Sequence, residues 1–306
     1  MWRMSQVSSN SAKNYHEDIS HGPIFIHSGF RTGGSAVYFQ IRTNSDLLCW
    51  YDPLSLKLHN LKKALHFGTN DWKSNHEESL QYFKEYSLIG SKRRIPLYSR
   101  KLRFDYLGER YASQFLDYID SLVDISSKLN RQAIFKFETS EGRAFLLKER
   151  FPTATNLLVR RNLILQEKSW LEQAALGNFS FYHSALQLLK NSGFKNFNSL
   201  KMPRYLKINL LSEIFLSYEH YRRSFLPNMD ITIDFSSNVA VVENNAKLKR
   251  LDLLIEYLNL VAFKLQENHQ SQNIDQDILN SYRRIVHNNS RVVNLPQNLK
   301  RIFPKL

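Results

Sequence analysis

The feature that most constrains the fold is an alternation of short apolar runs with amphipathic segments over about the first 180 residues. Four apolar runs have the length and composition of buried strands: 23–27, 47–51, 133–137 and 156–159. Segments with helical periodicity lie between and after them: 35–43, 54–67, 76–86, 109–129, 142–151 and 163–176. Strands that alternate with helices form a parallel sheet with right-handed crossovers. We therefore expect an α/β fold whose ligand lies at the carboxyl ends of the strands.

The last third of the chain is predicted to be rich in helices. Helical periodicity covers 181–190, 205–223 and 248–266, and a strand pair at 229–235 and 239–242 interrupts it. Residues 1–20 are polar and are expected to form a flexible lead. Because 306 residues is near the upper limit for one hydrophobic core, we expect residues 21–306 to form a single domain.

The chain carries a formal net charge of +14. Such a charge favours anionic partners, among them nucleic acid, anionic lipid, a nucleotide or an acidic glycan. The basic residues are spread along the chain except at 91–103, where six of them cluster. This cluster is typical of a solvated face, of an acceptor-docking loop or of an RNA-binding patch. Since the sequence contains no RNP, helix-turn-helix or zinc-finger pattern, we do not expect a nucleic-acid partner.

Cysteine content and hydropathy exclude further classes. The chain has one cysteine, Cys49, so neither a disulfide framework nor a cysteine-based metal site is expected. No window approaches the roughly 18–20 apolar residues that span a bilayer. The N-terminal segment lacks the apolar core of a signal peptide. We therefore expect a soluble, cytoplasmic protein; the sequence does not indicate its oligomeric state.

A small-residue turn joins the first predicted strand to the first predicted helix. Such a turn points backbone N–H groups at one spot, at the positive end of the helix dipole, where a phosphate binds. Gly33 and Gly34 allow close approach, Thr32 and Ser35 offer hydroxyl donors, and Arg31 supplies charge. No lysine follows the glycines, so this is not a Walker A loop. The structural alternative is a glycine turn that serves only tight packing of strand on helix.

This strand, turn and helix resemble the 5′-phosphosulfate loop of sulfotransferases that use 3′-phosphoadenosine 5′-phosphosulfate (PAPS). The arginine form, with Arg31 here, is that of Golgi carbohydrate members and many bacterial members. The resemblance extends over roughly residues 22–180 and implies the sulfotransferase fold, a P-loop-like parallel sheet flanked by helices. It also implies transfer of a sulfuryl group from PAPS to an acceptor hydroxyl, release of the product PAP, and no requirement for a metal.

The second motif of this family is a strand that ends in arginine, with a serine eight residues later. Arg161 and Ser169 occupy these positions and are implied to bind the 3′-phosphate, the group that distinguishes PAPS from ATP. Eight residues are about two helical turns. The alternative is that Arg161 is a surface charge at a strand end and Ser169 an exposed helix serine, which is the commoner position of each residue type. One difference is Leu163, where the family usually has proline.

The segment 50–54 resembles an aromatic-Glu-Pro-Leu segment of carbohydrate-type members, whose glutamate is the base in some bacterial enzymes. The resemblance implies that Asp52 accepts the proton of the acceptor hydroxyl. Asp52 is equally suited to capping the following helix. His27, at the first strand end, is a second candidate for the base, and His59 and Glu138 are further residues expected to face the acceptor. The implied acceptor is a carbohydrate or glycoconjugate.

Other functions are compatible with the same sequence. One is a phosphotransferase or nucleotide-binding protein with a degenerate P-loop, which magnesium dependence would distinguish from a sulfotransferase. Another is a basic nucleic-acid-binding protein, supported by the net charge and the 91–103 cluster. A third is a sulfotransferase-like binding protein without activity.

Overall fold

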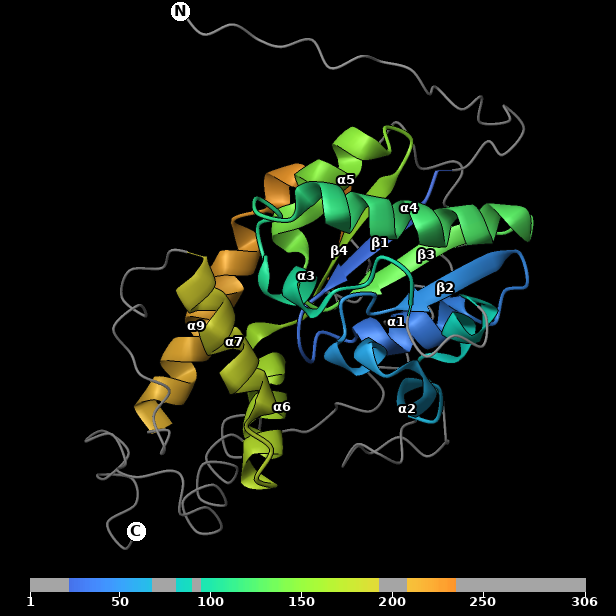
Figure 1. Cartoon of the computed structure of the whole chain (residues 1–306). Helices are drawn as coiled ribbons and strands as arrows, with labels where there is room; N and C mark the ends of the chain where they lie inside the picture. The colour runs from blue at the N-terminus through green and yellow to red at the C-terminus, as the bar shows by residue number, and fades with distance from the viewer. Residues whose placement is uncertain (1–21, 68–80, 90–94, 193–207, 235–306) are drawn as a thin grey trace, which may run out of the picture.

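The computed structural model describes residues 22–67, 81–89, 95–192 and 208–234. In this part of the chain, five strands form a parallel sheet of order β2-β3-β1-β4-β5 (Figure 1). They are β1 (Ile24–Ser28), β2 (Leu47–Tyr51), β3 (Gln132–Phe137), β4 (Thr155–Arg160) and β5 (Ile231–Asp234). The expected α/β fold with a parallel sheet is confirmed, and the first four strands lie within one residue of their predicted ends.

The centre of the sheet is formed by apolar strands that are buried on both faces. All five residues of β1 are buried, and Phe25 stacks on Phe135 of β3 with ring centroids 5.2 Å apart. Such continuous apolar runs are typical of a parallel sheet that helices cover on both sides. From β1 the chain passes to β2 and β3 on one side, then crosses to β4 on the other. The carboxyl end of β1 is therefore a switch point, where α/β proteins bind ligands.

Helices cover both faces of the sheet and form a separate group beside it. In Figure 1, α4 and α5 lie on one face and α1 and α2 on the other, whereas α6, α7 and α9 pack together to one side. Their bounds, and those of the short helices, are α1 (Gly34–Ile41), η1 (Leu56–His59), α2 (Leu61–Leu65), η3 (Lys84–Ile89), α3 (Arg100–Phe104), α4 (Ala112–Lys128), η4 (Glu141–Arg143), α5 (Ala144–Arg150), α6 (Leu163–Ala175), α7 (Ser180–Asn191), α9 (Ile208–Arg223) and η5 (Leu226–Asn228).

The described residues form two apolar cores. The larger core lies between the sheet and the helices on its faces, and the smaller core lies among α6, α7 and α9. Phe30, from the loop after β1, inserts into the smaller core, where its ring lies 6.0 Å from Trp170 and 5.5 Å from Tyr218. The helical group therefore fixes the position of the β1–α1 loop.

The prediction of one continuous helix over 54–67 was wrong. The helix expected over 54–67 is two short helices, η1 and α2, separated at Asn60. Asn60 has φ −128°, and its side chain accepts a hydrogen bond from the Lys63 N–H, so it caps α2 instead of continuing η1. The predicted strand 229–235 corresponds to β5, which pairs in parallel with β4, and the second strand of the predicted pair lies outside the described residues.

Some predicted segments fall wholly or partly outside the described residues. These are the lead 1–20, the strand 239–242, the helix 248–266, residues 91–94 of the basic cluster, the start of the helix 205–223, residue 235 of the strand 229–235 and the first part of the helix 76–86, whose described end overlaps the 3-10 helix η3. In the ranges that the structure describes, no helix has the length and apolar character needed to cross a bilayer.

Candidate functional site

The β1–α1 loop turns directly from a buried strand into a helix. Arg31 and Gly33 have positive φ angles of 62° and 94°. A Cβ atom on Gly34 would lie 2.2 Å from the Ser28 hydroxyl oxygen, so glycine is required for the loop to lie against β1. The first turn of α1 contains no acidic residue that would neutralise its N–H groups and dipole. This end of α1 therefore has the chemistry of an anion site.

The two loop hydroxyls have different surroundings. Thr32 is buried and donates to the Gly29 carbonyl oxygen at 3.0 Å, so the proton of its hydroxyl is used within the loop. The Ser35 hydroxyl is half-buried and lies 3.2 Å from the hydroxyl of Tyr51, at the end of β2. Ser35 therefore connects the loop to the side chains at the ends of β2 and β3.

The structure brings Arg31, Arg161 and Ser169 together from the ends of two adjacent strands. The Arg31 Nε donates to the Ser169 hydroxyl at 2.8 Å, and the Arg161 Nη1 donates to the Arg31 carbonyl oxygen at 3.4 Å. Arg161 directly follows β4, which ends at Arg160, and Ser169 lies in α6. We call these three residues the arginine–serine cluster.

Two guanidinium groups of like charge share this cluster. Burial lowers the pKa of Arg31. Burial and then the charge of Arg31 lower the pKa of Arg161 to about 10, and Glu172 partly offsets both effects. A bound anion would relieve this repulsion, and arginine presents several N–H donors to phosphate oxygens. The cluster therefore suits a phosphate group.

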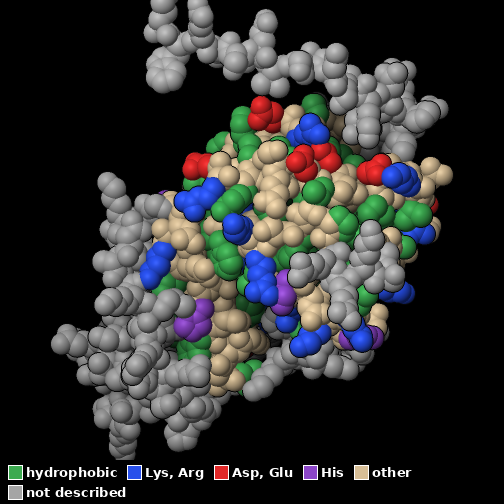
Figure 2. Space-filling view, viewed as in Figure 1, with side chains coloured by type: hydrophobic (Ala, Val, Ile, Leu, Met, Phe, Trp, Pro, Cys, Tyr) green, Lys and Arg blue, Asp and Glu red, His purple; other side chains and the backbone are tan. Residues whose placement is uncertain are grey.

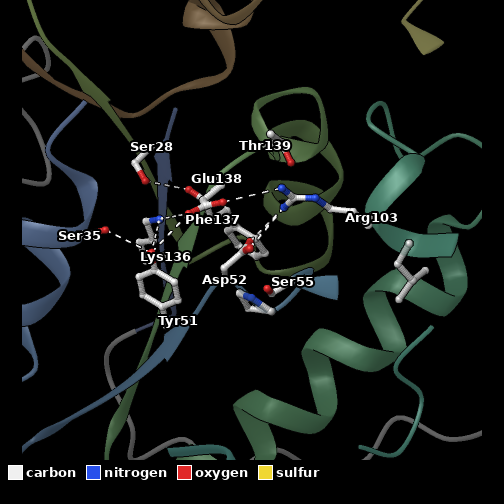
Figure 3. Close-up of polar contacts among 12 residues, drawn as sticks. Ser28, Ser35, Tyr51, Asp52, Ser55, Arg103, Lys136, Phe137, Glu138 and Thr139 are labelled. Atoms are coloured by element: carbon white, nitrogen blue, oxygen red, sulfur yellow. Dashed lines mark hydrogen bonds and ion pairs between the residues drawn. The ribbon is translucent and has the colours of Figure 1, made fainter. Parts of the chain in front are cut away.

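A second polar cluster lies at the carboxyl ends of β2 and β3 (Figure 3). Tyr51 and Lys136 are paired in the β2–β3 register, and the buried Lys136 ammonium donates to the Tyr51 hydroxyl at 3.3 Å. It also donates to the Glu138 carboxylate at 3.2 Å, and the Tyr51 hydroxyl donates to the same oxygen at 3.3 Å. Through Ser35 this cluster is hydrogen-bonded to the β1–α1 loop.

Arg103, from α3, joins the two carboxylates of this site. Its Nη1 lies 3.4 Å from each carboxylate oxygen of Asp52, and its Nη2 lies 3.8 Å from Glu138. Figure 3 shows the guanidinium of Arg103 between these two carboxylates. Together with Lys136, the group contains two cations and two carboxylates, so its formal charges cancel. We call these four residues and Tyr51 the charge network.

The two carboxylates differ in ionisation and in access. Burial raises the pKa of Asp52 to about 6 against the opposing effect of Arg103. Burial also opposes ionisation of Glu138, but Lys136 and Arg103 outweigh it and lower the pKa of Glu138. The Asp52 side chain is 4% exposed, whereas that of Glu138 is 24% exposed. Glu138 is thus the carboxylate that a bound molecule can reach.

The alternative role of Asp52 as a helix cap does not match its contacts. Its side chain faces Arg103, and the N-cap residue of η1 is Ser55, which makes no capping hydrogen bond through its side chain. Asp52 has φ 34°, and its N–H donates to the Lys136 carbonyl oxygen at 2.6 Å. The turn after β2 therefore holds Asp52 against β3.

Neither candidate histidine belongs to the charge network. His27 is fully buried, with Nδ1 2.8 Å from the Ser140 hydroxyl and Nε2 3.1 Å from the Asn156 side-chain oxygen. Burial lowers the pKa of His27, and both ring nitrogens are engaged, as in a structural histidine. His59 is exposed on η1, with Nδ1 2.5 Å from the Leu56 carbonyl oxygen.

Sequence reasoning missed Tyr51, Lys136 and Arg103 as site residues. A signal for Lys136 was present, because a lysine within the apolar run of β3 is costly to bury without a partner. Arg103 was counted only as a member of the basic 91–103 cluster, yet its side chain is directed inward.

Comparisons with known proteins add no assignment: no family model matches this chain, and no curated protein matches it. In the described part of the chain, no group of three or more His, Cys, Asp or Glu residues is arranged to hold a metal ion. The chemistry of the site must therefore be inferred from its own residues.

Proposed function

We propose that this protein is a PAPS-dependent sulfotransferase that transfers a sulfuryl group to a hydroxyl of a carbohydrate or glycoconjugate. The observation that carries the proposal is the arginine–serine cluster beside the start of α1. The start of α1 and the cluster form two adjacent anion sites at the ends of β1 and β4. PAPS carries phosphate groups on both the 5′ and the 3′ oxygen of its ribose, whereas ATP has no 3′-phosphate.

Each anion site has a role in this proposal. The first turn of α1, with Arg31 and Ser35, binds the 5′-phosphosulfate, and Arg161 and Ser169 bind the 3′-phosphate. Lys136 lies beside the loop, since its Cε would be 3.3 Å from a Cβ on Gly34. Its ammonium stabilises the negative charge that develops on the bridging oxygen as the sulfur–oxygen bond breaks.

Glu138 is the proposed base, because it is ionised and more exposed than Asp52. It accepts the proton of the acceptor hydroxyl while the acceptor oxygen forms a bond to sulfur. The bond from sulfur to the 5′-phosphate oxygen breaks, and PAP leaves with the electron pair of that bond. Asp52 and Arg103 position Glu138, and His27 supports the sheet.

Calorimetric titration tests the donor assignment. We expect PAP to bind much more tightly than AMP, and Arg161→Ala to weaken PAP binding by about 30–100-fold while AMP binding changes little. Arg131→Ala is the matched control. Arg131 is an exposed arginine just before the amino end of β3, whereas the proposed donor site lies at the carboxyl ends of the strands. If PAP binds no better than AMP, the donor is a different nucleotide and the proposal is wrong.

A further inference from the structure

The elements beside the charge network carry charge of one sign. Residues 53–67 and 95–104, which contain η1, α2 and α3, include no Asp or Glu. Their exposed basic and histidine residues are Lys57, His59, Lys62, Lys63, His66, Arg100 and Lys101. In Figure 2 the acidic side chains visible from this side lie in the upper part, with some blue side chains among them, whereas the lower part shows blue and purple side chains. We call the seven exposed residues the basic face.

Several of these cations have no carboxylate partner in the part of the chain that the structure describes. Among the described residues, no ion pair is formed by Lys62, Lys63, Arg100 or Lys101. Charges of both signs are interspersed on most protein surfaces, so a face of a single sign creates a field that attracts polyanions.

The short helix α3 connects the basic face to the charge network. Arg100 and Lys101 are exposed on it, whereas Arg103, two residues later, contacts Asp52 and Glu138. Hydrogen bonds fix this helix at both ends. The hydroxyl of Tyr98 donates to the Ser55 carbonyl oxygen at 2.6 Å, and Arg143 Nη2 donates to the Leu102 carbonyl oxygen at 2.5 Å. The same short helix therefore carries two exposed cations, Arg100 and Lys101, and the arginine that contacts Glu138.

We propose that the basic face is the acceptor-docking surface and that the acceptor is a polyanionic glycan that carries carboxylate groups. This inference rests on the proposed function, because an acceptor that has not yet been sulfated needs another source of negative charge. Lysine and arginine bind carboxylates through charge-assisted hydrogen bonds. The described residues of this face favour a glycan over single-stranded nucleic acid, which binds to series of exposed aromatic rings. Phe104 is the one exposed Phe, Tyr or Trp side chain in η1, α2 and α3.

Binding of labelled oligosaccharides tests this inference without the nucleotide. The probes are an oligogalacturonate and a neutral malto-oligosaccharide of the same length. The variants are Lys62→Gln/Lys63→Gln and Arg100→Gln/Lys101→Gln. The control is Lys128→Gln/Arg131→Gln, which removes two exposed cations near the amino-terminal edge of β3.

We expect the oligogalacturonate to bind wild type and the neutral probe to bind far more weakly. Each variant of the basic face should weaken oligogalacturonate binding by about tenfold or more at low ionic strength, and salt should reduce the difference. The control variant should bind as wild type does, and PAP binding should be the same in all variants.

Three outcomes would overturn the inference. One is equal affinity for the charged and neutral probes, and another is unchanged affinity in both variants of the basic face. The third is tighter binding of poly(U) RNA than of the oligogalacturonate through the same residues, which would assign the face to nucleic acid. Failure of PAP to bind would instead contradict the donor assignment, and the oligosaccharide titration would still report on the face.

Discussion

At the scale of single residues, the charge network consists of ion pairs of opposite sign. Lys136 meets Glu138 at 3.2 Å, and Arg103 meets Asp52 at 3.4 Å. A buried ion requires such a partner because its desolvation costs several kcal/mol. A substitution in the charge network therefore changes the ionisation of its neighbours as well as the reacting group. A neutral substitution of Asp52 therefore provides the reference for a neutral substitution of Glu138.

Neutral substitutions of the carboxylates should separate the base from its supporting residue. We expect Glu138→Gln to lower kcat by about 10²–10⁴-fold, because it removes the proton acceptor, and to leave PAP binding within a few-fold of wild type. Asp52→Asn should reduce kcat much less. Single-turnover rates of sulfuryl transfer, with calorimetry of PAP, measure both effects. A greater loss in Asp52→Asn than in Glu138→Gln would assign the base to Asp52.

The pH dependence of the reaction should respond to Arg103. Its positive charge lowers the pKa of both carboxyl groups, so Arg103→Gln should raise the pKa of each. Since the base works in its ionised form, activity is lost as the pH falls through its pKa, and a raised pKa moves this loss to higher pH. The pH profiles of kcat/KM for wild type, Arg103→Gln and Arg103→Lys measure the shift. A purely structural role of Arg103 predicts lower activity with an unchanged profile.

At the scale of secondary-structure elements, local patterns predicted the strands better than the short helices. The apolar run 47–51 predicted a strand whose ends are those of β2 in the structure. The leucine stripe through 54–67 predicted one continuous helix, because Leu58 and Leu61 both pack into the larger core. The stripe of leucines continues through this segment, but the helix is interrupted at Asn60. The Asn60 side chain forms a local hydrogen bond that competes with the helical hydrogen bonds.

In the candidate site, too, local sequence patterns predicted some of the contacts and not others. The proximity of Arg31, Arg161 and Ser169 could be predicted, because the two arginines follow strands that are visible in the sequence and Ser169 lies eight residues after Arg161. The contact of Tyr51 with Lys136 could not, because it joins residues 85 positions apart through the register of parallel strands. Register depends on tertiary packing, and no local pattern encodes it.

A methyl group on Gly34 should disrupt the junction of β1 and α1. A Cβ there would lie 2.2 Å from the hydroxyl oxygen and 2.3 Å from the Cβ of Ser28. We expect Gly34→Ala to destabilise the protein by about 1–3 kcal/mol and to weaken PAP binding, because the start of α1 must move. Urea unfolding and calorimetry measure the two effects. Since the clash is with the Ser28 side chain, Ser28→Gly should rescue part of the loss, and unchanged PAP binding in Gly34→Ala would contradict the role of this helix end.

At the scale of the whole molecule, a buried ion cluster joins the helical group to the sheet. Arg222 of α9 donates to Glu141 at 2.6 Å, to Glu219 at 3.0 Å and to the Val159 carbonyl oxygen of β4 at 2.9 Å. The guanidinium also lies under the β1–α1 loop, since a Cβ on Gly29 would be 2.5 Å from it. The smaller core thus supports the loop through Arg222 as well as through Phe30.

Loss of Arg222 should therefore affect both stability and the donor site. Arg222→Met leaves Glu141 and Glu219 buried without their cation, and we expect it to lower the free energy of unfolding by about 3–5 kcal/mol. The control Arg150→Met breaks the ion pair with Asp120, in which the arginine side chain is 49% exposed, and should cost about 1 kcal/mol or less. Urea unfolding measures both.

A double variant distinguishes unpaired charge from lost packing. In Glu141→Gln/Arg222→Met one of the two buried carboxylates is neutral, so part of the stability should return. The β1–α1 loop still lacks its supporting guanidinium, so PAP binding should stay weaker than in wild type even where the double variant is folded. Recovery of full PAP affinity together with stability would show that Arg222 stabilises the fold without positioning the loop.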